Sequence, residues 1–207
     1  MITSDARVYL YLPGSAMAVR AVFLVGFMAS GKSSLGKELA RRLRWDFVDL
    51  DLSIEAREGQ TIPEIFRNRG EHGFRLAETN ALHDLTESLE RDSVVALGGG
   101  AFAQPENREL LRPWPSVFLE APLEDLWRRC VEHTEQRPLR TDRVEFARLY
   151  QYRLPFYRQA TVTVVTSGKD PASLCEEIER KLLSWGRTVD TGLSQNPFAN
   201  SETGETQ

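Results

Sequence analysis

Residues 21–36, AVFLVGFMASGKSSLG, carry glycine, lysine and serine at the spacing G-x-x-x-x-G-K-[ST], which is typical of a loop that binds nucleotide phosphates. Gly26 and Gly31 free the backbone so that its N–H groups can turn toward phosphate oxygens. Lys32 would reach the β- and γ-phosphates, and the Ser33 hydroxyl would bind Mg²⁺. The alternative is a chance match in a glycine-containing turn. The apolar run before the motif and the helical pattern after it argue against that alternative.

A second candidate is the pair of carboxylates in Asp49-Leu50-Asp51, which ends a short apolar run. If this run is a strand, alternation places Asp49 and Asp51 on the same side, where an open α/β sheet meets its ligand. One carboxylate can hold Mg²⁺, directly or through water, and the other can face a substrate hydroxyl. The spacing leaves open a second interpretation, in which both are solvated acids that cap the next helix.

Glycines and arginines supply the remaining candidates. Three consecutive glycines after a buried-strand pattern would let a ligand approach the backbone closely, although a flexible turn is the alternative. These glycines are Gly98, Gly99 and Gly100. Arginine suits a bidentate grip on carboxylate or phosphate, although a single arginine is more often a solvated surface residue. The candidate arginines are Arg75, Arg137 and Arg153.

Alternating strand and helix patterns would position these residues, and they predict an α/β domain with a mainly parallel sheet. The expected strands cover about 20–25, 46–51, 93–97, 116–119 and 161–166. The expected helices cover about 32–43, a segment around Ile54, 61–69, 71–89, 105–111, 122–131, 144–159 and 171–185. We expect a capping box at Thr61 and Glu64, a break at Gly70 and a kink at Pro155.

The length of 207 residues allows one domain with a proper core. A net charge of −4 makes a general nucleic-acid-binding surface unexpected, and no apolar run approaches the length of a membrane span. Cys130 and Cys175 lack metal-binding spacing, and we interpret them as reduced structural thiols of a cytoplasmic protein.

We expect three regions along the chain. Residues 1–18 form an N-terminal extension, and Met17 is a possible alternative start. Residues 19–186 form the phosphate-binding domain, in which the polar segment of about 132–143 is expected to be a mobile loop. Residues 187–207 lack apolar periodicity and are expected to be disordered.

Together, these motifs resemble those of the shikimate kinase family, in unbroken order from about residue 19 to residue 183. The matching residues are 26–33, 47–51, Ile54, Glu55, Ile65, Phe66, Gly70, Glu71, Phe74, Arg75, Glu78, 97–101, 137–139, Arg153, Pro155, Tyr157 and Ala160. The resemblance implies a P-loop fold like that of nucleoside-monophosphate kinases, with three α/β/α layers, a central five-stranded parallel sheet and a lid at about 132–143. It implies ATP-dependent phosphorylation of the 3-hydroxyl of shikimate, with Mg²⁺ as cofactor, in chorismate and aromatic amino acid biosynthesis. We expect a monomer that binds ATP and shikimate.

Carried over by position, the resemblance gives three residues catalytic roles: Lys32, Asp51 and Arg137, the last of them on the lid. It assigns ATP binding to Gly26, Met28, Ala29, Ser30, Gly31, Lys32, Ser33, Ser34, Arg129 and Arg137. It assigns shikimate binding to Asp51, Arg75, Gly98, Gly99, Gly100 and Arg153, and the metal to Ser33 and Asp49.

Two departures from the family pattern fall on the lid. Arg140 stands where the family usually has an apolar residue, and the segment between Arg137 and Arg153 is shorter than usual. Two other functions therefore stay open. One is a kinase of the same fold for gluconate or a nucleoside monophosphate, and the other is a nucleotide-binding module that has lost catalysis.

Overall fold

The computed structural model describes residues 21–133 and 142–193. Its sheet has five parallel strands in the order β2-β3-β1-β4-β5. The strands are β1 (Ala21–Val25), β2 (Asp46–Asp49), β3 (Ser93–Ala96), β4 (Ser116–Glu120) and β5 (Val162–Val165). All five residues of β1 are buried, because this central strand is covered on both faces.

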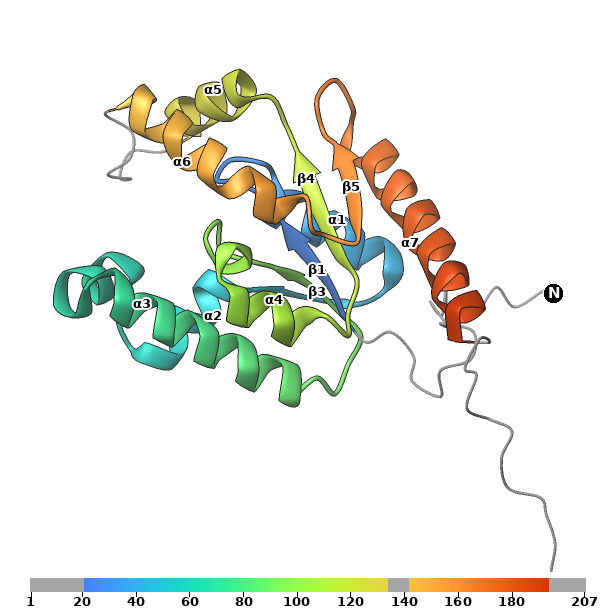
Figure 1. Cartoon of the computed structure of the whole chain (residues 1–207), viewed down its shortest axis with the longest axis horizontal. Coiled ribbons are helices and arrows are strands. Elements are labelled where there is room, and N and C mark those ends of the chain that lie inside the picture. The colour runs from blue at the N-terminus through green and yellow to red at the C-terminus, as the bar shows by residue number, and fades with distance from the viewer. Residues whose placement is uncertain (1–20, 134–141, 194–207) are drawn as a thin grey trace, which may run out of the picture.

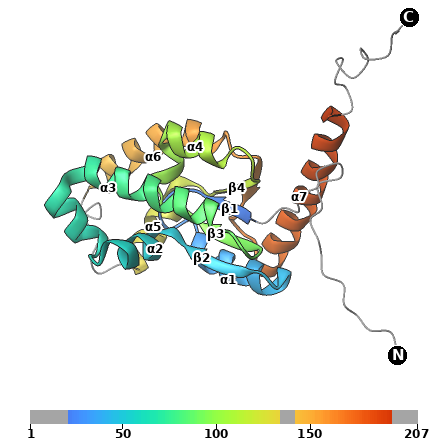
Figure 2. The ribbon, with the colours of Figure 1, turned by 90° about the horizontal axis from the view of Figure 1, so that it is seen from below.

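Helices cover both faces of the sheet, which gives the three expected layers (Figures 1 and 2). They are α1 (Lys32–Leu43), α2 (Leu50–Glu58), α3 (Ile62–Glu87), α4 (Pro105–Leu111), α5 (Leu123–His133), α6 (Arg143–Tyr157) and α7 (Pro171–Leu193), with a 3-10 turn η1 at Ala101–Ala103. One apolar cluster packs α1 and α7 against one face of the sheet. A second cluster packs the helices from α2 through α6 against the other face. The fold is therefore the predicted α/β architecture.

Local sequence signals account for several element boundaries. Helix α1 has the predicted bounds, and the capping box at the start of α3 is present, with the Thr61 N–H donating to Glu64 Oε2 at 2.8 Å. Gly70 breaks the helical path within α3, with φ 67° and ψ −175°. Helix α6 includes Pro155 and continues to Tyr157, so the proline does not end it.

Two boundaries differ from the predictions. Strand β2 ends at Asp49 and α2 begins at Leu50, so Asp51 lies in the first helical turn and not on the strand. Strand alternation therefore does not relate Asp49 to Asp51. Helix α7 runs to Leu193, past the expected end at Trp185, so residues 187–193 are helical and not part of a disordered tail. The N-terminal extension, Met17, most of the expected lid and residues 194–207 lie outside the described residues.

The helices do not have the character of membrane spans. Among the residues that the structure describes, no helix combines the length and the apolar character needed to cross a bilayer.

Candidate active site

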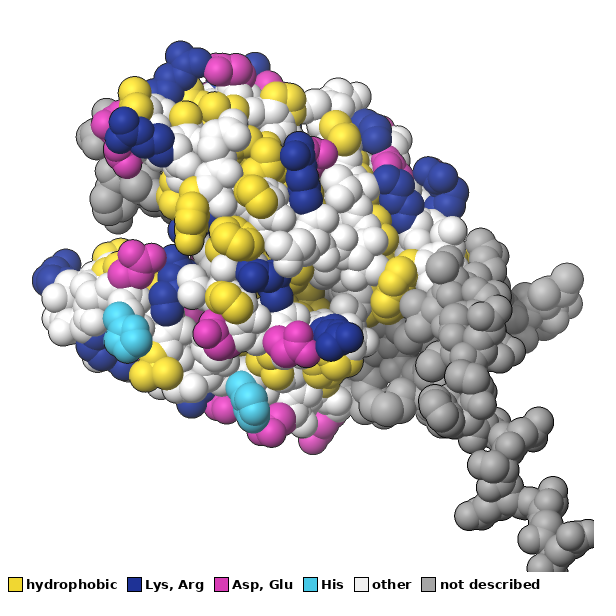
Figure 3. Space-filling model, viewed as in Figure 1, with side chains coloured by type: hydrophobic (Ala, Val, Ile, Leu, Met, Phe, Trp, Pro, Cys, Tyr) yellow, Lys and Arg dark blue, Asp and Glu magenta, His cyan; other side chains and the backbone are white. Residues whose placement is uncertain are grey.

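The candidate residues meet where β1, β2 and β3 end. Strand β1 pairs with β3 on one side and with β4 on the other, so the loop after β1 opens at the point where the strand order reverses. Ligands of open α/β sheets bind at this position, outside the carboxyl ends of the strands. In the space-filling view, the face shown is hollowed at its left edge, between α6 and α3, and charges of both signs are interspersed over it (Figure 3).

The phosphate loop has the backbone conformation that its glycines permit. Gly26 and Gly31 have φ values of 152° and 94°, and Ala29 between them has φ 60°. A Cβ added at Gly26 would lie 2.8 Å from Ser30 Oγ, so a larger residue does not fit. Lys32 Nζ donates to the carbonyl oxygens of Gly26 (2.8 Å) and Phe27 (2.9 Å), which holds the ammonium group over the loop.

Asp49 joins the phosphate loop to the second strand. Ser33 Oγ donates to Asp49 Oδ2 at 2.8 Å, and Asp49 Oδ1 accepts from the backbone N–H of Asp51 at 3.2 Å. Asp49 therefore caps α2 and also faces the phosphate loop, so the capping and the metal-binding interpretations are compatible. Mg²⁺ in kinases is typically held by one or two carboxylates together with substrate phosphates. The hydroxyl and carboxylate oxygens of Ser33 and Asp49 fit that chemistry.

Asp51 points to a different place, the glycine triplet after β3. A Cβ added at Gly98 would lie 2.6 Å from Asp51 Oδ1 and 3.0 Å from Glu78 Oε1. A Cβ at Gly100 would overlap the Arg75 guanidinium, and one at Gly99 would lie 3.6 Å from Arg153 Nη1. The triplet is therefore surrounded by polar side chains from α2, α3 and α6. They are Asp51, Arg75, Glu78 and Arg153.

Arg75 and Glu78 form a buried ion pair on α3, with 2.8 Å between Nη1 and Oε2. The Glu78 side chain is only 1 % exposed, and burial raises its pKa, an effect that the positive charge of Arg75 only partly offsets. Burial lowers the pKa of Arg75, but the negative charges of Glu78 and Glu71 raise it by more than burial lowers it. The guanidinium therefore stays charged. Arg75 Nε and Glu78 Oε1 are buried without a hydrogen-bond partner in the described part of the chain. Polar atoms left unpaired in this way are typical of functional sites.

Comparisons with known proteins identify the family of the chain. The model of the shikimate kinase family matches residues 28–183. The shikimate kinase of Persephonella marina is 39 % identical over 161 residues, which are 77 % of this chain and 97 % of that protein. The chain belongs to the shikimate kinase family. A shikimate kinase of Thermus thermophilus is 42 % identical over 166 residues, with coverages of 78 % and 89 %.

Solved structures of the shikimate kinase family have the same fold. The shikimate kinase from Acinetobacter baumannii in complex with shikimate matches with a TM-score of 0.73 and 36 % identity, over 80 % of this chain and 94 % of that one. The family and the fold predicted from the sequence are thus confirmed.

Two aromatic residues with no role in the sequence-based assignment also contact the candidate site. The Arg153 guanidinium carbon lies 5.9 Å from the centre of the Phe27 ring, and the Tyr157 hydroxyl donates to the carbonyl of Gly99. Arg153 and Tyr157 are four residues apart on a helix, a spacing that places both side chains on one face. That spacing is the signal in the sequence that could have indicated Tyr157.

For the other predicted site residues, the structure gives a position but few contacts within the site. Met28, Ala29, Ser30 and Ser34 lie in or just after the phosphate loop, as expected. Arg129 is half-buried on α5, and its charge helps to lower the pKa of Asp125, after the Ser167 hydrogen bond and Arg128. Arg137 lies outside the described residues.

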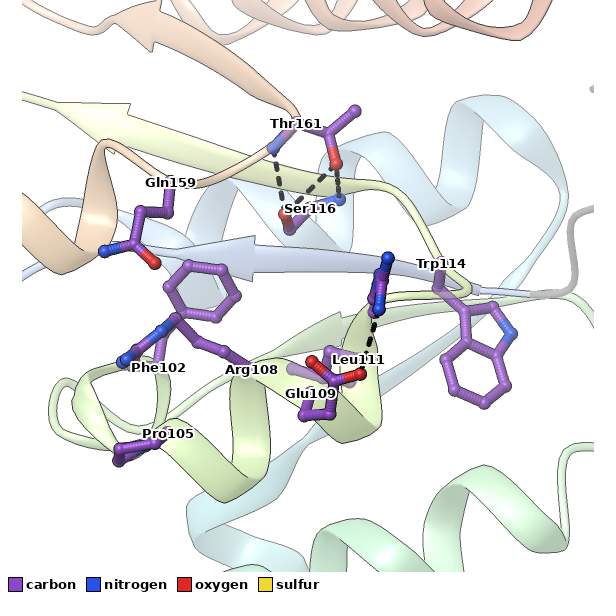
Figure 4. Close-up of a pocket in the computed structure, with 10 residues that line it drawn as sticks. Phe102, Pro105, Arg108, Glu109, Leu111, Trp114, Ser116, Gln159 and Thr161 are labelled. Carbon is purple, nitrogen blue, oxygen red and sulfur yellow. Dashed lines mark hydrogen bonds and ion pairs between the residues drawn. The ribbon is translucent and has the colours of Figure 1, made fainter. Parts of the chain in front are cut away.

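A pocket of about 460 Å³ lies away from this site, beside α4 and the beginnings of β4 and β5 (Figure 4). Its polar side chains bond to each other or to backbone groups. The backbone N–H of Ser116 donates to Thr161 Oγ1 at 3.1 Å, and Arg112 donates to Glu109 at 3.1 Å. Because it is at the opposite end of the strands from the phosphate loop, this pocket takes no part in the candidate active site.

Proposed function

We propose that this member of the shikimate kinase family transfers the γ-phosphoryl group of ATP to the 3-hydroxyl of shikimate, giving shikimate 3-phosphate. The observation that carries the proposal is the contact between the phosphate loop and the glycine triplet. A Cβ at Gly99 would lie 3.5 Å from Met28 N and 3.9 Å from Gly26 O. A nucleotide phosphate held by the loop and an acceptor held by the triplet would therefore be adjacent, as transfer requires.

The acceptor half of the site consists of Asp51, Arg75, Arg153 and the triplet. Two guanidinium groups from separate helices can grip the carboxylate of shikimate from two directions, which fixes orientation as well as affinity. The Asp51 carboxylate can accept a hydrogen bond from a ring hydroxyl and orient it for attack. A monoanionic substrate with several hydroxyl groups matches this combination of two positive groups and one negative group.

The donor half consists of the phosphate loop, in which residues 26 and 28–34 would bind ATP. Lys32 would leave the loop carbonyls for the β- and γ-phosphates, because phosphate oxygens carry full negative charge. Ser33 and Asp49 would hold Mg²⁺, which supplies charge neutralisation on the β- and γ-oxygens. Arg129 at the nucleotide base and Arg137 at the transferring phosphate keep the roles that the family resemblance gives them. We expect a monomer in the cytoplasm.

A coupled assay of ADP release with shikimate, gluconate and AMP as acceptors tests the proposal. We expect turnover with shikimate that depends on Mg²⁺ and is at least about 100-fold greater in kcat/KM than with the other two acceptors. Turnover with gluconate or AMP but not with shikimate would show that shikimate is not the substrate. Binding of ATP, measured by calorimetry, without turnover of any acceptor would support an inactive nucleotide-binding module.

A further inference from the structure

Tyr157, near the end of α6, has a hydroxyl group that packing alone does not explain. Its side chain is fully buried, and its ring lies 5.3 Å from that of Phe118. Phenylalanine would fill this space equally well. The hydroxyl instead donates to the carbonyl oxygen of Gly99, the middle glycine of the triplet.

The direction of this hydrogen bond constrains Arg153. A carbonyl oxygen can only accept, so the single Tyr157 proton is committed to Gly99 and the phenol oxygen can only accept from other groups. The Arg153 guanidinium lies close enough for its charge to act on the Tyr157 hydroxyl, and a guanidinium can only donate. The lone pairs of the Tyr157 oxygen therefore remain available to Arg153, while its proton is held by Gly99. Burial raises the pKa of Tyr157 to about 12, so the phenol keeps its proton.

Arg153 has neighbours on three sides. The Phe27 ring is 5.9 Å from its guanidinium carbon, the Tyr157 hydroxyl lies within reach of its charge, and its Nη1 is 3.6 Å from where a Cβ of Gly99 would lie. A long arginine side chain has many rotamers, and contacts that remove this freedom before a ligand arrives increase affinity.

The same hydroxyl also orients a peptide group of the triplet. Peptide bonds in the described residues are trans, so the C=O of Gly99 and the N–H of Gly100 point in opposite directions. When Tyr157 holds the carbonyl, it therefore fixes the direction of the Gly100 N–H. Glycine needs such an external contact more than other residues do, because its backbone is the least restricted.

We infer that Tyr157 is a positioning residue that orients both Arg153 and the Gly99–Gly100 peptide for the carboxylate of the acceptor. This inference rests on the proposed role of Arg153 in binding shikimate. It gives the hydroxyl of Tyr157 an effect on the acceptor half of the site and none on the donor half.

The test compares Tyr157→Phe with a matched variant, Tyr150→Phe. Tyr150 is also a buried tyrosine of α6, and its hydroxyl donates to a backbone carbonyl, that of Ala121, at 3.3 Å. Both variants lose one buried hydrogen bond, so their Tm values should fall by similar amounts. We expect Tyr157→Phe alone to raise the KM for shikimate about tenfold, with the KM for ATP within about twofold of the parent. Equal shikimate KM values in the two variants would overturn the inference.

A double-mutant cycle with Arg153→Ala separates the possible failures. If Tyr157 acts through Arg153, Tyr157→Phe should have less than about one third of its effect on the shikimate KM in the Arg153→Ala background. An undiminished effect would show that Tyr157 acts independently of Arg153 and would contradict the inference. An unchanged shikimate KM in Arg153→Ala itself would instead contradict the proposed function of that arginine.

Discussion

Ser33 Oγ donates a hydrogen bond of 2.8 Å to Asp49 Oδ2, although Ser33 lies in the first turn of α1 and Asp49 ends β2. The bond links the helix after β1 to the end of β2, two strands that do not pair with each other, because β3 lies between them. It brings a hydroxyl and a carboxylate together beside the phosphate loop, which is the oxygen chemistry that Mg²⁺ prefers.

Asp49→Asn should weaken the use of Mg²⁺ without disturbing the fold. Asparagine is as good a helix cap as aspartate, so α2 keeps its start, but the negative charge is lost. We expect the Mg²⁺ concentration for half-maximal activity to rise about tenfold, with the shikimate KM unchanged. The control is Asp46→Asn on the same strand, where the side chain is 57 % exposed. Similar Mg²⁺ titrations for the two variants would exclude Asp49 from the metal site.

Lys32→Ala should abolish turnover. The lysine is the one positive side chain within the loop motif, and stabilising charge on the transferring phosphoryl group is the main catalytic requirement of this reaction. We expect kcat to fall by at least about 10³-fold in the ADP-release assay, and Lys37→Ala, on the exposed side of the same helix, to leave it unchanged. A Lys32→Ala enzyme that retained a tenth of the parent kcat would contradict this role.

Arg153→Ala should raise the KM for shikimate by about 30-fold, because it removes a charged hydrogen-bond donor worth about 2 kcal/mol. Arg75→Ala should have a similar effect on KM but should also destabilise the protein by about 3 kcal/mol, since Glu78 is then buried without its partner. The control is Arg148→Ala, an exposed arginine of α6 that pairs with Glu145. Unchanged shikimate KM values in both site variants would remove these arginines from the pocket.

Gly100→Ala should act on substrate binding through Arg75. The new methyl group would overlap the end of a flexible side chain, so the guanidinium must move while the backbone stays in place. We expect the shikimate KM to rise about tenfold. Gly168→Ala is the opposite case, because its φ of 72° is strained for alanine but the space around it is open. It should cost about 1 kcal/mol of stability and leave both KM values unchanged.

Glu78→Gln should make stability less dependent on pH. Burial raises the pKa of Glu78 above its ordinary value of 4.5, so between those two pKa values the folded protein holds more protons than the unfolded chain. The contribution of Glu78 to the free energy of unfolding therefore falls as pH rises above about 4.5, and the glutamine variant lacks this loss. Urea unfolding at a series of pH values should show the variant gaining stability relative to the parent as pH rises. A relative gain on lowering the pH would mean that the ion pair with Arg75 outweighs burial.

Local patterns in the sequence were sufficient for the fold class and for the phosphate loop. Glycine spacing, an apolar run before it and an apolar periodicity after it specify β1, the loop and α1, because each depends on residues close together in the chain. The capping box at Thr61 and the break at Gly70 were predictable for the same reason. The arginines and the triplet were identified as candidates by type, and family resemblance related them to each other.

Only the tertiary structure decided how the acceptor pocket is assembled. The sequence placed Asp51 on a strand beside Asp49, whereas an earlier helix start turns Asp51 toward Gly98. The full burial of Glu78 and the bond from Tyr157 to Gly99 likewise depend on α3 and α6 packing around the end of β3. Such contacts join residues far apart in the chain, so their geometry and electrostatics follow from packing and not from local propensity. The sequence by itself determined which chemical groups this protein has, and the tertiary structure decided which of them meet.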